Sequence, residues 1–420
     1  MTIIHAKTCW QLRQRMLGEK HPDTIRAQHD LATSFYATKQ WAEAIAMGEQ
    51  CLQLRRDVLG TTHPDTLATQ HNLIMSLNAA NKSEEAVQMA EECWKLRQDI
   101  LGPKHPYTFT SQNELAVSLY NTKQLTKAVK VAEECFQLRR NVLGVNHLDT
   151  LLSQHNLAVY LAATKQLPEA KKMAKKCWQL RRDVLGSNHP DTLETQHNLA
   201  LYTEQLTKAI KIAEECFRLR QKTLGNKHPA TLKTQHMLAL FLNTTGRAEE
   251  ARAMVEECWY LRQDILGPKH PATLVTQHNL AACLLASRQP QKAAKMAEEC
   301  WQLHKEVHGN NHVDTLTSQH SLAVYFNMNG ESEKALCMAK ACWQMRQNVL
   351  GPEHPDTLKT QDSVAKYLYA TGQSKKAAEV AEKCWQSRKK VLGDKHLDTL
   401  AIQHNMAFYS LASKKIQEEE

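Results

Sequence analysis

The stretch LGEKHPDTIRAQHDLA, residues 17 to 32, decides the fold because the chain repeats it. It returns as LGTTHPDTLATQHNLI at residues 59 to 74 and as LGSNHPDTLETQHNLA at residues 185 to 200. A glycine marks each copy, and successive glycines are 42 residues apart except for one interval of 39. The ten markers are Gly18, Gly60, Gly102, Gly144, Gly186, Gly225, Gly267, Gly309, Gly351 and Gly393. A fixed period predicts an array of similar repeats and not a set of independent globular domains.

One repeat, from Gly60 to Gly102, contains the signals of two helices. Pro64 suits a first helical position because its missing N–H is not needed there, and Asp65 faces the positive end of the helix dipole. Apolar residues then recur at helical spacing until the polar stretch NAANKSEE interrupts them. A second apolar stripe follows and ends at Gly102, a residue that readily adopts positive φ. We name the first helix A and the second helix B.

One such helix pair cannot bury its own apolar stripe, so each pair must stack on its neighbours. We therefore expect an all-α protein, a right-handed superhelical solenoid of about ten stacked helix-turn-helix repeats with the A helices inside. The 42% apolar and 6% aromatic content fits a helical chain better than a sheet. The expected single array covers residues 1–412, and a charged C-terminal tail follows at residues 413–420.

These residues make the chain resemble the tetratricopeptide repeat, in the 42-residue form found in kinesin light chains and in the sensor arrays of fungal and bacterial signalling NTPases. The motif NLA, the pair Glu85 and Ala86, and the pattern LGxxHPDTL carry the resemblance. It implies that Leu73 is the large residue of helix A and Ile74 its small neighbour. It also implies the tightly packed positions of helix B, which are Ala86, Ala90 and Cys93.

The resemblance implies a concave groove, lined by the A helices, that holds extended or helical peptides. We therefore expect a non-enzymatic scaffold or adaptor whose partners are proteins or peptides. The alternative is the ligand-sensing arm of a STAND-type signalling ATPase. Those ATPases carry a GxxxxGK[ST] loop, and no such stretch occurs in this chain, nor does the heptad segment by which kinesin light chains join their heavy chains.

Two irregularities lie at the ends and in the middle of the array. The chain starts inside a helix B, at residues 1–17, and ends after a helix A near Ala412. This phase suggests a piece of a longer array, or ends that stack on another copy of the chain. The short repeat, residues 186–225, lacks three residues after Tyr202, which predicts a shorter helix A at residues 190–202 and a local break in the groove.

Cysteine and an aromatic residue recur side by side in helix B. Equivalent positions of stacked helices lie about 10 Å apart, too far for a shared zinc ion or a disulfide, so we interpret both columns as core packing. The cysteines are Cys9, Cys51, Cys93, Cys135, Cys177, Cys216, Cys258, Cys300, Cys342 and Cys384. The aromatic residues are Trp94, Phe136, Trp178, Phe217, Trp259, Trp301, Trp343 and Trp385.

Histidine forms two columns with different predicted roles. The column before Pro, which starts at His21 and His63, is expected to cap the A helices. The second column points toward the groove by the family's register, and its imidazoles and neighbouring amides suit a peptide backbone. Protonation near a pKa of ~6.5 would let it attract acidic ligands; the alternative is that each histidine bonds within its own repeat. The peptide-binding candidates are His29, His71, Asn72, Asn113, His155, Asn156, His197, Asn198, His236, His278, Asn279, His320, Asp362 and His404.

Other chemistry has weaker support. His304, His308 and His312 have metal-like spacing, but Gly309 breaks the helix and no fourth ligand is evident, so we expect a divergent repeat and no metal. We also expect no catalytic residue and no cofactor, because we find no catalytic motif with a unique acid, base or nucleophile outside the repeat register. One basic stretch is interpreted as a solvated helix face and not as a nucleic-acid site. It comprises Lys171, Lys172, Lys175, Lys176, Arg181 and Arg182.

The opening residues MTIIHAKTCWQLRQR contain no signal-peptide-like apolar stretch, and no run of 18 apolar residues occurs anywhere. Twelve cysteines without such a signal suggest reduced thiols. We therefore expect a cytoplasmic protein that binds neither membranes nor nucleic acid.

Overall fold

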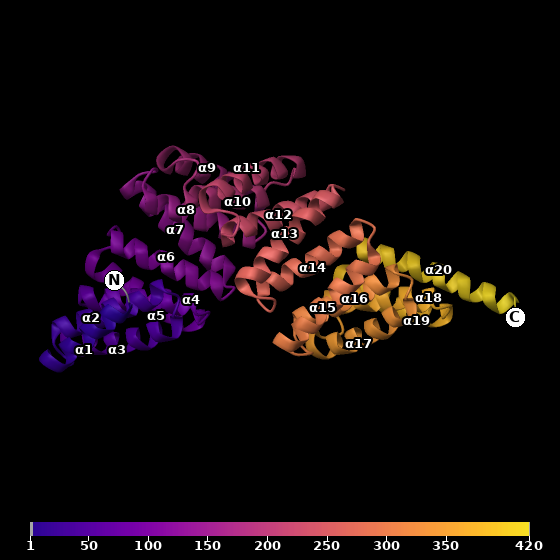
Figure 1. Ribbon diagram of the computed structural model, residues 1–420, viewed down its shortest axis with the longest axis horizontal. Helices are drawn as coiled ribbons and strands as arrows, with labels where there is room; N and C mark the ends of the chain where they lie inside the picture. The colour runs from indigo at the N-terminus through magenta and orange to yellow at the C-terminus, as the bar shows by residue number, and fades with distance from the viewer. Residues whose placement is uncertain (1–2, 420) are drawn as a thin grey trace. The chain divides into compact units, whose positions relative to one another are not determined.

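The computed structural model describes the backbone of residues 3–419 and the side chains of residues 3–414. Over this range the chain forms 20 helices and no strand, which confirms the expected all-α class (Figure 1). Residues 1–212 and 213–420 form two compact units, and the boundary falls inside α11 (Leu206–Leu224). We describe each unit by itself as the N-terminal unit and the C-terminal unit.

Helices A and B alternate along both units. The A helices are α2 (Pro22–Ala37), α4 (Pro64–Ala79), α6 (Pro106–Asn121), α8 (Leu148–Ala163), α10 (Pro190–Leu201), α12 (Pro229–Thr244), α14 (Pro271–Ala286), α16 (Val313–Met328), α18 (Pro355–Ala370) and α20 (Leu397–Glu419). Besides α11, the B helices are α1 (Ile3–Leu17), α3 (Trp41–Leu59), α5 (Ser83–Leu101), α7 (Leu125–Leu143), α9 (Leu167–Leu185), α13 (Ala248–Leu266), α15 (Pro290–His308), α17 (Ser332–Leu350) and α19 (Ser374–Leu392). The predicted shortening is confirmed, because α10 has 12 residues where α4 has 16.

Every A helix begins after a histidine that caps it. In α4 the Nδ1 atom of His63 accepts the backbone N–H of Asp65 at 3.2 Å, which satisfies one of the free donors of the first turn. The same bond recurs at all ten repeats, so the prediction for this column is confirmed. The histidines are His21, His63, His105, His147, His189, His228, His270, His312, His354 and His396.

The turns that join the helices depend on positive φ. Gly60 has φ of 91°, and its N–H bonds to the carbonyl of Arg56 to close helix B. Between helices A and B a second residue adopts positive φ, which is glycine at Gly246 but lysine at Lys123, with φ of 62°. A lysine in the left-handed region is strained relative to glycine. The backbone strain of these turns therefore differs from repeat to repeat.

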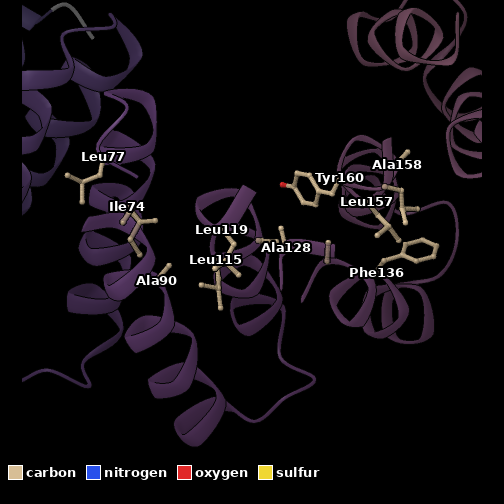
Figure 2. Close-up of a cluster of buried hydrophobic side chains, with 14 of the residues drawn as sticks. Ile74, Leu77, Ala90, Leu115, Leu119, Ala128, Phe136, Leu157, Ala158 and Tyr160 are labelled. Atoms are coloured by element: carbon tan, nitrogen blue, oxygen red, sulfur yellow. The ribbon is translucent and has the colours of Figure 1, made fainter. Parts of the chain in front are cut away.

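The core of each unit is built from the positions that the resemblance indicated. In the second repeat of the N-terminal unit, Leu73, Ile74, Ala86, Ala90 and Cys93 are all buried. Figure 2 shows the adjoining part of this core, where Leu115 and Leu119 of α6 lie beside Ala128 of α7. Ala and Cys at the helix contacts allow close approach of the backbones, so the aliphatic side chains of helix A fill the space between repeats.

Candidate peptide-binding groove

Within each unit the A helices lie closer to one another than the B helices do. Successive A helices contact each other at α2 and α4, α4 and α6, α12 and α14, and α16 and α18, whereas no pair of successive B helices in the described chain has contacts as extensive. A stack whose A helices approach more closely must curve toward them. The A helices therefore form the inner face of each unit.

The second histidine column joins neighbouring repeats instead of facing open solvent. His29 is the eighth residue of α2, and its Nδ1 and Nε2 atoms each lie 3.3 Å from α4, from Thr69 Oγ1 and Asn72 Nδ2 respectively. In the same way His155 Nδ1 lies 3.1 Å from Thr195 Oγ1 of α10. Neither alternative in the sequence interpretation named this arrangement, because the bonds run from one A helix to the next.

Two further members of the column also bond to the following A helix, but through different atoms. His236 Nε2 lies 2.8 Å from Asn279 Nδ2. Asn113, which replaces histidine in α6, accepts a bond of 3.2 Å from the Nδ2 atom of Asn156. At His29, His155, His236 and Asn113 the eighth residue of the A helix therefore forms a polar joint with the following repeat, whether it is an imidazole or an amide.

Asp362 is the second replacement in the column, and its joint is ionic. Its Oδ2 atom lies 2.8 Å from Lys366 Nζ and 3.9 Å from Nη2 of Arg388. Ile402 stands in α20 where the A helices from α4 to α18 have threonine or serine, so the hydroxyl partner of this joint is missing. The carboxylate of Asp362 takes over that role by pairing with the arginine.

Burial of these candidates differs along the chain. His197, His236 and His320 are buried, as are Asn113 and Asn198, whereas His404 is exposed. The remaining candidates are half-buried, and these are His29, His71, Asn72, His155, Asn156, His278, Asn279 and Asp362. These candidates lie on successive A helices along the inner face. The half-buried ones expose only part of their side chains to a ligand.

The same burial changes the expected protonation. The pKa values of three histidines are lowered to about 4, first by desolvation and then by the guanidinium of a nearby arginine. These histidines are His71, His236 and His320. These three imidazoles are therefore neutral around pH 6.5. The expectation that the column gains positive charge near that pH is wrong for them, because burial disfavours the charged form.

A column of buried arginines was missed by the sequence interpretation. Arg97 of α5 donates from Nη1 to Tyr107 O at 3.0 Å and to Ser111 Oγ at 2.9 Å, and from Nη2 to Leu67 O at 3.0 Å. One guanidinium thus ties a B helix to the A helices on both sides. The buried members are Arg55, Arg97, Arg139, Arg181, Arg220, Arg262, Arg346 and Arg388. The recurrence of arginine at one register of the sequence could have identified them.

This column corrects the interpretation of Arg181 and explains the position of His304. Arg181 was assigned to a solvated basic face, but it is buried and bonds to Asp191 O and Thr195 Oγ1. His304 occupies the arginine register in α15, where its Nδ1 lies 3.0 Å from Cys300 O and burial lowers its pKa. The residues with described side chains contain no group of three His, Cys, Asp or Glu residues placed to hold a metal ion.

The repeated cysteines and aromatic residues are packing residues, as predicted. Burial raises the pKa of the Cys177 thiol to about 11, and its Sγ lies 3.3 Å from Leu151 O. Trp94 and Trp178 pack against the core of the N-terminal unit, and Trp301 packs against the core around Leu322 in the C-terminal unit.

The fifth residue of each A helix lies three residues before the joint and on the same face. None of the ten is buried, and unlike the joint they differ from repeat to repeat. They are Arg26, Ala68, Thr110, Leu152, Glu194, Lys233, Val275, Thr317, Lys359 and Ala401.

Two hollows lie on these inner faces. A cavity of about 130 Å³ is lined by α2, α3 and α4, and one of about 540 Å³ by α16, α18, α19 and α20.

No described helix is both long enough and apolar enough to cross a membrane.

No curated protein matches the chain. Among solved structures, a putative kinesin light chain of Podosopora anserina with nearly identical TPR-like repeats is 29% identical, over 48% of this chain and 97% of that one, with a TM-score of 0.44. A STAND protein with a tetratricopeptide repeat sensor from Pyrococcus horikoshii is 12% identical, over 91% of this chain and 55% of that one, with a TM-score of 0.60. The apo form of RapI is 10% identical, over 87% and 98%, with a TM-score of 0.62.

The last two likenesses show the fold alone. Profiles of the tetratricopeptide repeat match residues 3–57, 23–99, 107–182, 200–258, 234–303, 315–356 and 357–398. Together these ranges include most of the chain, and they follow the helix pairs described above. An array of this kind is a protein–protein interaction scaffold. The chain belongs to the tetratricopeptide repeat family.

Proposed function

We propose that the chain is a non-catalytic scaffold that binds peptide segments of partner proteins along the inner faces of its A helices. The observation that carries this proposal is the contrast between two neighbouring columns. At four A helices the eighth residue bonds to the next repeat, whereas the fifth residues of all ten are unburied and chemically varied. A surface whose framework is constant and whose exposed residues vary is suited to recognition of one extended sequence.

The two hollows support the same location. The larger one combines Lys359 and Lys366 of α18 with Asn405 of α20, so charged groups and an amide converge on one space. The smaller one includes Met75 and Tyr36 beside His29 and is largely apolar. A peptide bound to the C-terminal unit would meet polar groups there, and a peptide bound to the N-terminal unit would meet an apolar depression.

Selection from a peptide display library tests the proposal. The expected result is that the chain enriches a peptide whose affinity falls when Leu152→Asp or Lys359→Glu alters a fifth residue. Lys172→Glu is the matched control, because Lys172 is exposed on α9, a B helix, and its substitution should leave affinity unchanged. Loss of binding with the α9 variant, together with full binding by both A-helix variants, would contradict the proposed surface.

A further inference from the structure

Glu114 differs from every other residue at its register. It is the ninth residue of α6, in the N-terminal unit, and it is the only glutamate at this position of the A helices. The equivalent residues are Asp30, Asn72, Asn156, Asn198, Met237, Asn279, Ser321, Ser363 and Asn405. Its neighbour Asn113 is the amide that replaces histidine in the joint column, so α6 departs from the repeat pattern at two adjacent positions.

The carboxylate of Glu114 is half-buried and lacks a cation. Its Oε1 atom accepts one hydrogen bond, of 3.3 Å, from Nδ2 of Asn113. Over residues 3–414 no lysine, arginine or histidine lies within 4.0 Å of it. Burial raises the pKa of this carboxyl group, as expected where a negative charge has lost water without gaining a positive partner.

One internal cation, Arg139, acts on Glu114 without forming an ion pair with it, although its Nε atom is buried without a partner. Arg139 of α7 acts on Glu114 through its field, but its Nη1 atom donates to Asp149 O at 2.9 Å and to Ser153 Oγ at 2.8 Å. These are the bonds of the buried arginine column, and they hold the guanidinium between α7 and α8. The fold therefore uses Arg139 for the joint and leaves Glu114 without an ion pair.

Two tyrosine residues, one in α2 and one in α8, feel the charge of this carboxylate. Burial and, after it, the charge of Glu114 raise the pKa of both Tyr36 in α2 and Tyr160 in α8, so its field reaches both hydroxyl groups. Tyr120 stacks on Tyr160 with ring centroids 4.7 Å apart. In Figure 2 the hydroxyl of Tyr160 points away from Leu157 of the core cluster.

A half-buried carboxylate that has one hydrogen bond and no ion pair has the chemistry of a site for an organic cation. The carboxylate supplies a negative charge and hydrogen-bond acceptors. A metal ion would need several carboxylate or imidazole ligands, and none of the described side chains form such a group around Glu114. A guanidinium or ammonium group fits the single charge.

We propose that Glu114 receives the side chain of an arginine or lysine in the bound peptide. This inference rests on the proposed function, because it assigns one residue class of the peptide to one place on the inner face of the N-terminal unit. It also gives the unpaired carboxylate a partner that the chain itself does not provide. Binding of the cation then stabilises the charged form of Glu114.

The test is a positional-scanning library of acetylated and amidated hexapeptides, screened against the full chain. Glu114→Gln removes the charge and keeps a carbonyl oxygen for Asn113. Asp30→Asn is the matched control, since Asp30 is an exposed carboxylate at the same register of α2. We expect one peptide position to favour Arg or Lys, and we expect Glu114→Gln to weaken the selected peptide by at least about tenfold, as for loss of a charge-assisted hydrogen bond. Asp30→Asn should leave the preference intact.

The outcomes separate this inference from the proposed function. If the wild-type chain enriches no peptide, the proposed function fails and the inference fails with it. If peptides are enriched without a basic preference, or if the preference persists in Glu114→Gln, only the inference is overturned. The melting temperature gives a second readout: Glu114→Gln should melt at the same or a higher temperature than wild type. A clear decrease would show that the carboxylate has a structural partner and would also overturn the inference.

Discussion

Replacement of His320 by asparagine should make the C-terminal unit less sensitive to acid. The substitution is one the array already contains, because Asn113 occupies the same register in α6. His320 is buried with 7% of its surface exposed, and its Nδ1 atom has no hydrogen-bond partner among the described side chains. Burial and then Arg346, Lys359 and Lys366 lower its pKa from 6.5 to about 4, with Asp356 acting in the opposite direction.

The sign of the effect follows from proton linkage. Between pH 6.5 and pH 4 the unfolded chain binds a proton at His320 that the folded chain does not bind, so the free energy of unfolding falls as the pH falls. The pKa difference corresponds to about 3 kcal/mol when the pH has reached 4, and to nothing above pH 6.5. His320→Asn removes this contribution, so wild type should lose about 3 kcal/mol more than the variant over the same interval.

Urea unfolding at a series of pH values from 7.5 to 4.5 measures this difference, followed by tryptophan fluorescence. Ser321→Asn is the matched control, because it changes the next residue of α16 without removing an ionisable group, and asparagine occurs there in other repeats. The gap between wild type and this control should not depend on pH. A pH-independent gap between wild type and His320→Asn would refute the reasoning that burial holds this imidazole neutral.

Three further predictions concern the joints, turns and thiols. Arg346→Lys should lower the free energy of unfolding by about 3 kcal/mol, because lysine cannot keep both bonds to Asp356 O and Thr360 Oγ1 inside the stack. Chemical denaturation measures this loss, and a loss below about 0.5 kcal/mol would contradict the prediction. Lys123→Gly should stabilise the N-terminal unit by about 0.5–1 kcal/mol, because the residue has φ of 62°; an unchanged or lower melting temperature would argue against strain there. Cys337 is the one exposed thiol among the described residues and should react first with a disulfide reagent, whereas all twelve cysteines should react after denaturation; equal rates in the folded state would contradict the packing role of the column.

Local features of the fold were predictable from the sequence because they depend on contacts within one repeat. His63, Pro64 and Gly102 mark helix ends through bonds to residues at most four positions away. The shorter α10 followed from three missing residues after Tyr202. Such signals act over a few residues, so the repeat itself contains them.

The polar joints were less predictable because they depend on how two repeats lie against each other. His29 bonds to Thr69 and Asn72, 40 and 43 residues away, and the periodicity alone does not say which face of α2 meets α4. Arg181 looked like part of a basic surface because its neighbours are lysines. Arg181 is instead buried, and its guanidinium donates a hydrogen bond to the carbonyl of Asp191 in the next repeat.

Glu114 illustrates a different limit. Comparison of the ten repeats already identifies it as the one glutamate at its register, so the sequence contained a signal that the interpretation did not use. Its lack of an ion pair could not be read from the sequence, because that depends on where Arg139 directs its guanidinium. Departures from a repeat pattern are therefore informative only when the neighbouring helices are placed.

Photo-crosslinking of a selected peptide tests the central claim most directly. A peptide from the display selection, carrying a benzophenone group at each position in turn, would be irradiated in complex with the chain, and the attachment sites would be mapped by mass spectrometry. The account predicts attachment to A helices, at or beside fifth residues such as Leu152 and Lys359. Attachment confined to exposed B-helix residues such as Lys172 would contradict it.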